Sequence, residues 1–190
     1  MELVCQNYFY KNGDLLDHLG QDNYNSCMLK AVFPGTFDPP TNGHMNLISR
    51  AATIFEKLYV VVAVNQGKKC LFTAEERKIM MEKLLSKYDN VEVKLWDRLI
   101  VDFAAQYGAK VMLRGVRALA DFGYEFELAM TNKGLSPELE IMFMPTDPKY
   151  FVLRSSAIKE IAMYDGDIST MVPPEVAQVL KDKLLKRETS

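Results

Sequence analysis

A glycine- and proline-rich stretch over residues 34–44 carries the side chains best suited to chemistry. It reads Pro-Gly-Thr-Phe-Asp-Pro-Pro-Thr-Asn-Gly-His, follows a short apolar run and ends on His44 at the start of an expected helix. Unpaired N–H groups and the helix dipole attract anions at such a position, and the dipole disfavours a cationic imidazole. We therefore expect a neutral His44 that donates a hydrogen bond to charge developing on a phosphorus atom. A histidine that only caps the helix is the alternative.

A second loop with basic side chains follows the apolar run of residues 58–64. Lys68 lies close behind the end of this run, where a lysine can reach a phosphate as a point charge. Its neighbour Lys69 is interpreted as a solvated charge. The spacing alone leaves open that Lys68 is solvated too.

Two arginines flank a glycine after a further short apolar run. Arg114 and Arg117 can hold phosphate groups bidentately, and Gly115 lets the backbone come close to them. The alternative is that the arginines pair with Asp121 or Glu125 on the face of the helix that follows. Their position at the expected mouth of the sheet favours phosphate binding.

Two hydroxyl groups open another expected helix near the C-terminal end. Ser155 and Ser156 can cap this helix through their side chains. They can also present N–H and O–H donors to the β- and γ-phosphates of a nucleotide. The sequence is compatible with both roles at once.

The elements that position these loops alternate between strand and helix. A capping box, with Thr73 as N-cap and Glu76 three residues later, predicts one helix start. Gly108 is expected to close one helix and Gly134 another. Strands are expected over residues 29–33, 58–64, 91–95, 111–113 and 140–144, and helices over residues 41–57, 73–87, 100–107, 121–133, 155–164 and 174–186.

This alternation predicts an α/β protein with a Rossmann-like, doubly wound parallel five-stranded sheet and helices on both faces. Ligands of such sheets bind beyond the carboxyl ends of the strands, so the loops after the first, second and fourth strands should form the site. Residues 28–190 are interpreted as one domain, because a single core usually serves about 100–200 residues. Residues 1–27 are interpreted as an N-terminal extension, either artefactual or a native tail that packs on a partner subunit.

Composition argues against several classes of function. A net charge of −2 without a long basic stripe is atypical of nucleic-acid binding. The longest apolar run, residues 58–64, is far shorter than the roughly 20 residues that span a bilayer, and no secretory signal is evident. Cys5, Cys27 and Cys70 are scattered outside any metal-ligand spacing, which favours a reduced, cytoplasmic setting.

The stretch over residues 34–44 resembles the T-x-G-H signature of the nucleotidyltransferase superfamily, and its full wording is closer to the bacterial phosphopantetheine adenylyltransferases. Three later blocks are similar to that family in the same order. Residues 68–77 look like its K-K-x-x-F-T-x-E-E-R, residues 114–125 like its R-G-x-R-x-x-x-D-F-x-Y-E, and residues 150–160 like its I-S-S-S-x-x-K-E. The resemblance covers about residues 28–186, and the 114–125 block is its most substrate-specific part.

The resemblance implies transfer of the adenylyl group of ATP to 4′-phosphopantetheine, which gives dephospho-coenzyme A and pyrophosphate in coenzyme A biosynthesis. It implies that His44 stabilises the transition state. It assigns the acceptor to Thr36, Lys68, Ile100 and Arg114. It assigns ATP to Thr36, Phe37, His44, Gly115, Val116, Arg117, Glu125, Tyr150, Phe151, Val152, Leu153, Arg154, Ser155 and Ser156.

Arg154 departs from the resemblance, because the family pattern more commonly has serine at this position. Our hypothesis is that Arg154 adds a charged contact to the triphosphate, and the alternative is a surface ion pair, for example with Asp147. Mg²⁺ is expected to arrive with ATP, with no ligands from protein side chains. A homohexamer is implied by the resemblance alone.

Two other functions stay open from the sequence. The chain could be another nucleotidyltransferase of the superfamily, acting on nicotinamide mononucleotide or glycerol phosphate. It could also be a catalytically silent nucleotide-binding module. Retention of His44, Lys68, Arg114 and both serines argues against the silent module.

Overall fold

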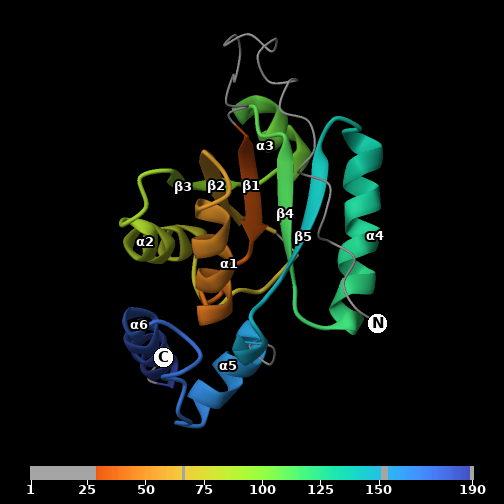
Figure 1. Ribbon diagram of the computed structural model, residues 1–190. Coiled ribbons are helices and arrows are strands. Elements are labelled where there is room, and N and C mark those ends of the chain that lie inside the picture. The colour runs from red at the N-terminus through yellow and green to blue at the C-terminus, as the bar shows by residue number, and fades with distance from the viewer. Residues whose placement is uncertain (1–28, 66, 151–153, 189–190) are drawn as a thin grey trace, which may run out of the picture.

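The computed structural model describes residues 29–65, 67–150 and 154–188 of the 190-residue chain (Figure 1). The expected N-terminal extension, residues 1–27, lies outside this part. The described strands are β1 (Lys30–Gly35), β2 (Lys57–Ala63), β3 (Val91–Trp96), β4 (Val111–Val116) and β5 (Glu140–Pro145). The described α-helices are α1 (Asn42–Ala52), α2 (Ala74–Leu85), α3 (Ile100–Tyr107), α4 (Leu119–Leu135), α5 (Ser155–Met163) and α6 (Pro174–Glu188).

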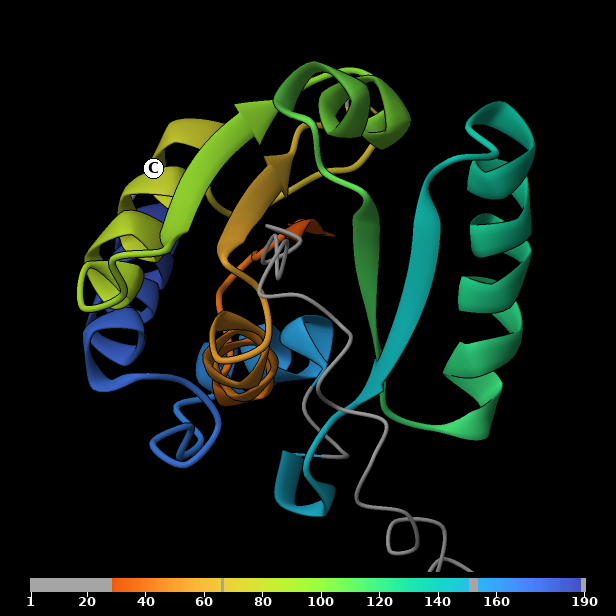
Figure 2. The same cartoon turned by 45° about the horizontal axis from the view of Figure 1, so that its top comes forward.

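The described strands form one parallel sheet in the order β3-β2-β1-β4-β5. The chain runs outward from β1 to β3, then returns to the other side of β1 with β4 and β5. Helices α1 and α2 cover one face of the sheet, while α3 and α4 cover the other (Figure 2). The doubly wound, Rossmann-like fold is thus confirmed, and its switch point lies between β1 and β4.

Strand β2 shows how the sequence supports this layering. Leu58, Val60 and Val62 pack on the α1 and α2 side, whereas Tyr59 and Val61 pack on the α3 side. Successive side chains of a strand point to opposite faces. A strand covered on both faces therefore needs an unbroken apolar run, which is what residues 58–64 supply.

A third apolar cluster joins α5 and α6 to the loop before α2. Ile158 of α5 and Leu180 of α6 pack with Leu71 and Phe72 of that loop. Both helices lie beyond the carboxyl ends of the strands (Figure 1). The cluster therefore fixes the start of α5 beside the end of the sheet where ligands are expected.

Strands β1 and β4 separate towards their carboxyl ends. Their pairing is limited to Ala31 with Val111 and Val32 with Met112. Strand β4, in contrast, pairs with β5 along its whole length. The sheet consequently opens at the switch point, between the last residues of β1 and those of β4.

Two expected helix ends were wrong. Helix α1 ends at Ala52 rather than residue 57, because the N–H and hydroxyl groups of Thr53 bond to the carbonyl of Arg50. The turn that follows buries Phe55 in the core, and β2 begins at once. Helix α4 continues through Gly134 to Leu135, since an isolated glycine is tolerated within a helix when no cap interrupts it.

Smaller differences affect other boundaries. Helix α2 ends at Leu85 instead of residue 87, while its capping box of Thr73 and Glu76 is confirmed. Gly108 closes α3 in the left-handed conformation, as expected. Strand β4 runs to Val116, so Arg114 belongs to the strand itself. Within the described residues, no helix is both long and apolar enough to cross a membrane.

Candidate active site

A cavity of about 680 Å³ lies at the opening between β1 and β4. The starts of α1 and α5, the loop after β2 and the first part of α4 complete its wall. This is the position at which doubly wound sheets bind ligands. Twelve of the residues singled out in the sequence line the cavity: Thr36, Phe37, His44, Lys68, Ile100, Arg114, Gly115, Arg117, Glu125, Arg154, Ser155 and Ser156.

Some of the expected site residues are placed differently. Val116 and Tyr150 are not among the residues that line the cavity. Val116 ends β4 and its carbonyl accepts a hydrogen bond from the N–H of Thr146. Lys69, which was interpreted as solvated, is exposed but does line the cavity. The expected nucleotide contacts over residues 151–153 lie outside the described residues.

His44 is held by a capping box at the start of α1. The hydroxyl of Thr41 accepts a hydrogen bond from the N–H of His44 at 3.3 Å, and the N–H of Thr41 donates to Nδ1 of His44 at 3.0 Å. Because Nδ1 accepts a backbone hydrogen bond, the proton of the neutral ring resides on Nε2. The other ring nitrogen is therefore a hydrogen-bond donor on a residue that lines the cavity.

The protonation of His44 follows from its surroundings. Desolvation of the ring, and then the positive charge of Arg117, lower the pKa of His44 to about 4. Both effects disfavour the imidazolium form. His44 is thus neutral near pH 7. The alternative prediction of a histidine that only caps the helix is incomplete, because His44 both caps α1 and lines the cavity.

Phe37 supports His44 from the β1–α1 loop. Its ring packs edge-on against the imidazole, with the ring centres 5.1 Å apart. Phe37 adopts a positive φ of 51°, and its ring occupies the space beside Gly35. A side chain on Gly35 would meet this ring at 2.6 Å. Gly35 therefore makes room for Phe37, in addition to lining the cavity.

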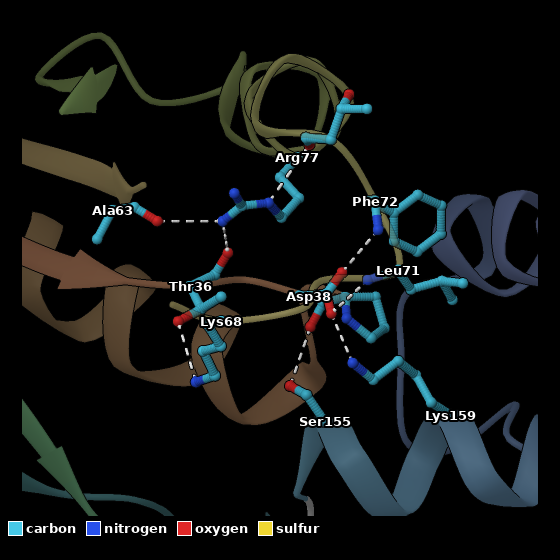
Figure 3. Close-up of polar contacts among 11 residues, drawn as sticks. Thr36, Asp38, Ala63, Lys68, Leu71, Phe72, Arg77, Ser155 and Lys159 are labelled. Atoms are coloured by element: carbon cyan, nitrogen blue, oxygen red, sulfur yellow. Dashed lines mark hydrogen bonds and ion pairs between the residues drawn. The ribbon is translucent and has the colours of Figure 1, made fainter. Parts of the chain in front are cut away.

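Asp38 connects three segments through its carboxylate. It is 5% exposed and accepts hydrogen bonds from the N–H groups of Leu71 and Phe72 and from Nζ of Lys159 (Figure 3). Burial opposes its ionisation, but the bonds from Lys159, Phe72 and Leu71 outweigh this effect and lower the pKa of Asp38. The carboxylate thus ties the β1–α1 loop to the α2 entrance and to α5.

Helix α5 is held to the same loop by a second bond. The hydroxyl of Ser155 donates to the carbonyl of Pro39 at 3.1 Å. Ser155 and Ser156 both line the cavity, at the first turn of the helix. The first turns of α1 and α5 therefore both border the cavity, and the free N–H groups typical of a helix start suit an anion.

The arginines of β4 and its following loop are paired with acidic side chains of α4. Arg114 contacts Glu125 through Nε at 2.6 Å and through Nη2 at 2.5 Å. Arg117 contacts Asp121 at 3.1 Å. These are the pairs that the sequence left open as an alternative, and the structure places them in the cavity wall rather than on a solvated helix face.

Asp121 also contacts Arg154, at 3.4 Å. The alternative prediction that Arg154 pairs with Asp147 was wrong: Arg154 contacts Asp121, and Asp147 pairs with Lys149. The side chain of Arg154 is 61% exposed, so it is the most open of the paired cations of the cavity. One carboxylate thus holds two arginines at the cavity mouth.

The cavity has a strong positive balance. Among its described lining residues, six side chains are basic and three are acidic: Lys68, Lys69, Arg114, Arg117, Arg154 and Lys159 against Asp38, Asp121 and Glu125. Two helix N-termini add to this potential. The arrangement is suited to bind a polyanion and to stabilise charge on a transferring phosphoryl group.

Sequence reasoning missed Asp38, Arg77 and Lys159 as parts of the site. Arg77 donates to the carbonyls of Thr36 and Ala63, which line the cavity (Figure 3). Its place one helical repeat before the buried Met81 was a usable signal. The pairing of Asp38 with Lys159 left no comparable signal in the sequence, because the two residues are 121 positions apart.

Comparisons with known proteins agree with this geometry. The cytidylyltransferase-like family model matches residues 32–161. A phosphopantetheine adenylyltransferase of Clostridium perfringens is 44% identical over 158 residues, which is 83% of this chain and 96% of that protein. The enzyme of that name from Desulforudis audaxviator is 46% identical over 80% of this chain and 94% of its own length. The one from Streptomyces coelicolor is 43% identical over 84% and 100%, respectively.

A solved structure supports the fold independently. The putative nicotinate-nucleotide adenylyltransferase of Vibrio parahaemolyticus superposes with a TM-score of 0.64 over 85% of this chain and 97% of that one, at 20% identity. At this identity the likeness shows the Rossmann-like fold alone. Family membership rests on the matches in sequence, which span nearly the whole length of the relatives. The chain therefore belongs to the phosphopantetheine adenylyltransferase family, within the cytidylyltransferase-like superfamily.

Proposed function

We propose that this protein transfers the adenylyl group of ATP to the phosphate of 4′-phosphopantetheine. An oxygen of the acceptor phosphate attacks the α-phosphorus, and the bond between that phosphorus and the bridging oxygen to the β-phosphate breaks. Dephospho-coenzyme A forms and pyrophosphate leaves. The nucleophile is already an anion, so no strong general base is needed.

The neutral His44 at the start of α1 is the observation that carries this proposal. Its Nε2–H donor can stabilise charge on the α-phosphate without giving up its proton, because the pKa of about 4 keeps the ring neutral. The basic cavity around it screens the repulsion between two polyanions and holds them in line. Proton transfer has no part in this role.

The other side chains divide between the two substrates. Lys68 and Arg114 would hold the acceptor phosphate, with Thr36 close to Lys68 through a contact of 3.4 Å and Ile100 lining the same cavity. Arg117, Arg154 and the two serines would contact the triphosphate. In this proposal Glu125 keeps Arg114 in place, in addition to its expected contact with ATP.

Mg²⁺ is proposed to enter with the nucleotide. Its chemistry is to neutralise phosphate oxygens. The carboxylates that line the cavity, Asp38, Asp121 and Glu125, are each engaged by basic side chains. Within the described residues, no group of three or more potential ligands is arranged for a metal ion. The residues present fit a metal that is held mainly by the phosphates it brings.

Release of pyrophosphate from ATP tests the proposal. Phosphopantetheine, nicotinamide mononucleotide and glycerol phosphate would be compared as acceptors, with CTP in place of ATP for the last. We expect turnover with phosphopantetheine and ATP. Turnover with another acceptor alone would assign a different reaction of the superfamily, and ATP binding without any turnover would support the silent module.

We also propose self-association into a homohexamer in the cytoplasm. An apolar stripe on α4 supports the assembly, since Phe122, Phe126 and Met130 follow each other at helical spacing and are 37, 45 and 49% exposed. Light scattering after size-exclusion chromatography would measure the mass against the 21.7 kDa of one chain. Met130→Glu is expected to reduce the mass, whereas Ile79→Glu on the exposed side of α2 should not. A monomeric unaltered protein would contradict the assembly.

A further inference from the structure

Arg77 breaks two local rules of protein structure. Arg77 is only 3% exposed, although charged side chains are almost never fully buried unless they are paired. It also lies in the first turn of α2 after the N-cap Thr73, where a positive charge is disfavoured by the helix dipole. Residues that break local rules commonly belong to functional sites.

The partners of Arg77 are backbone carbonyls. Its Nη1 donates to Thr36 at 2.6 Å and to Ala63 at 3.2 Å, and its Nε donates to Thr73 at 3.3 Å. Figure 3 shows the guanidinium between the ends of β1 and β2. In the part of the chain that the structure describes, Arg77 has no ion pair with a carboxylate. Nε and Nη1 of the guanidinium are therefore bonded to carbonyl oxygens, and none of the ion pairs of the described residues places a carboxylate beside it.

The carbonyls that Arg77 binds belong to the cavity wall. Thr36 and Ala63 line the cavity, whereas Arg77 itself does not. A carbonyl oxygen pointing into the cavity would repel a phosphate, but these two oxygens are directed at the guanidinium behind the wall. In addition, a buried positive charge is poorly screened and acts over a longer distance than an exposed one.

We propose that Arg77 is a positioning residue that adapts the cavity to anions, by turning the carbonyls of Thr36 and Ala63 away from it and by adding an uncompensated positive charge behind its wall. Stability alone is a weak reason for such a residue. A buried charge is costly to desolvate, and well-packed apolar residues often replace buried ions without loss of stability. The inference rests on the proposed function, because it takes the ligand to be a polyphosphate.

Two substitutions separate the charge of Arg77 from its hydrogen bonds. Arg77→Gln keeps an N–H donor and removes the charge, whereas Arg77→Lys keeps both a donor and the charge. Met81→Ala is the matched control, because Met81 lies one helical repeat later on the buried side of α2 and does not contact the cavity. It destabilises the helix without altering the charge behind Thr36.

Calorimetric titration with Mg²⁺–ATP, and with pyrophosphate as a simpler anion, provides the test. We expect Arg77→Gln to weaken both affinities about tenfold. One nearby opposite charge shifts the pKa of an ionised group by about one unit or more, and one unit is a tenfold change in an equilibrium constant. Arg77→Lys should remain near the unaltered protein, and Met81→Ala should bind normally despite a lower Tm. For any variant of low stability, the rise in Tm on adding ligand reports the same affinity.

The outcomes are distinguishable. Equal affinities in Arg77→Gln and the unaltered protein would overturn the role of Arg77. Equal weakening in Arg77→Gln and Met81→Ala would overturn it too, because it would trace the loss to the stability of α2. If the unaltered protein bound pyrophosphate but not ATP, the proposed function would fail, while the pyrophosphate affinities would still decide the role of Arg77.

Discussion

The β1–α1 loop and the start of α4 face the same cavity but use their polar groups in different ways. Asp38 of the loop accepts bonds from two backbone N–H groups and from Lys159, and His44, at the start of α1 directly after the loop, is bonded to Thr41. These bonds keep both side chains in place. In the second region, Arg114 and Arg117 are paired with carboxylates of α4. These ion pairs are half-buried in the cavity wall, where the phosphates of the proposed substrates would compete with the carboxylates for the arginines.

The first region keeps a group in a fixed position, whereas the second supplies charge for binding. A group that stabilises a transition state must be held in position, since a small displacement loses much of its effect. A group that binds a mobile polyanion needs charge above all, and a carboxylate can hold its place until the ligand arrives. Substitutions in the two regions should therefore affect different quantities.

The largest effect is expected for His44→Ala. Loss of a preorganised donor should lower kcat by about 10²–10³, with little change in the KM for ATP, because the charge it stabilises develops in the transition state. Steady-state kinetics measures both constants. Ser49→Ala, on the same helix but away from the cavity, is the control and should be silent. A normal kcat in His44→Ala would remove the proposed role.

Asp38→Asn should weaken the loop itself. The amide cannot accept from all three donors, and Lys159 loses its counter-ion. We expect the free energy of unfolding to fall by about 3 kcal/mol, measured by denaturant unfolding at pH 7. Asp182→Asn, on an exposed part of α6, should change it little. Unaltered stability in Asp38→Asn would show that the loop is held by other contacts.

The pH dependence of stability reports on His44. Its pKa is lowered from 6.5 to about 4 in the folded protein, so the unfolded chain binds the proton first as the pH falls. The contribution of His44 to the free energy of unfolding should therefore be fully present above about pH 6.5 and be lost as the pH falls towards 4. We expect His44 to account for about 3 kcal/mol of this loss, since a shift of about 2.5 pKa units corresponds to that free energy.

Unfolding of His44→Asn at the same pH values isolates this contribution. The carboxylates with lowered pKa values, such as Asp38, also cost stability in acid, because their contribution is lost as the pH falls through the folded pKa. They titrate in both proteins, so the difference between the two curves belongs to His44. Parallel curves would mean that the imidazole of His44 is not held neutral.

The smallest effect is expected for Arg154→Ser. Its exposed side chain shares Asp121 with Arg117, and exposed ion pairs contribute little. We expect the KM for ATP to rise about two- to fivefold, the usual range for one partly screened contact. Arg98→Ser, on an exposed loop outside the cavity, is the control. An unchanged KM would leave Arg154 as a surface partner of Asp121.

Much of the fold was accessible from the sequence. Alternating apolar runs and amphipathic helices are local patterns, so the order of elements and the parallel sheet were predicted. The errors occurred at helix ends that the apolar spacing does not mark: Phe55 continues the spacing of α1, yet the bonds of Thr53 to Arg50 end the helix before it and Phe55 packs in the core.

The candidate site divides in the same way. His44, Lys68 and Arg114 were found because the ends of parallel strands meet at one edge of the sheet, so that separate loops share a cavity. Asp38 and Arg77 were missed as supporting residues. Their partners are distant in the chain, and nothing in a linear pattern indicates which backbone groups a buried charge will meet.

The sequence by itself indicated the class of chemistry, because a histidine at a helix start beside basic strand ends suits phosphate chemistry and four motifs resemble one family in the same order. It also determined the fold, because strand and helix periodicities are encoded in short stretches. Only the tertiary structure decided which carboxylates hold the arginines, which carbonyls Arg77 binds and which segments Asp38 connects. Each of these depends on burial and on contacts between distant segments, which exist only after the chain has folded.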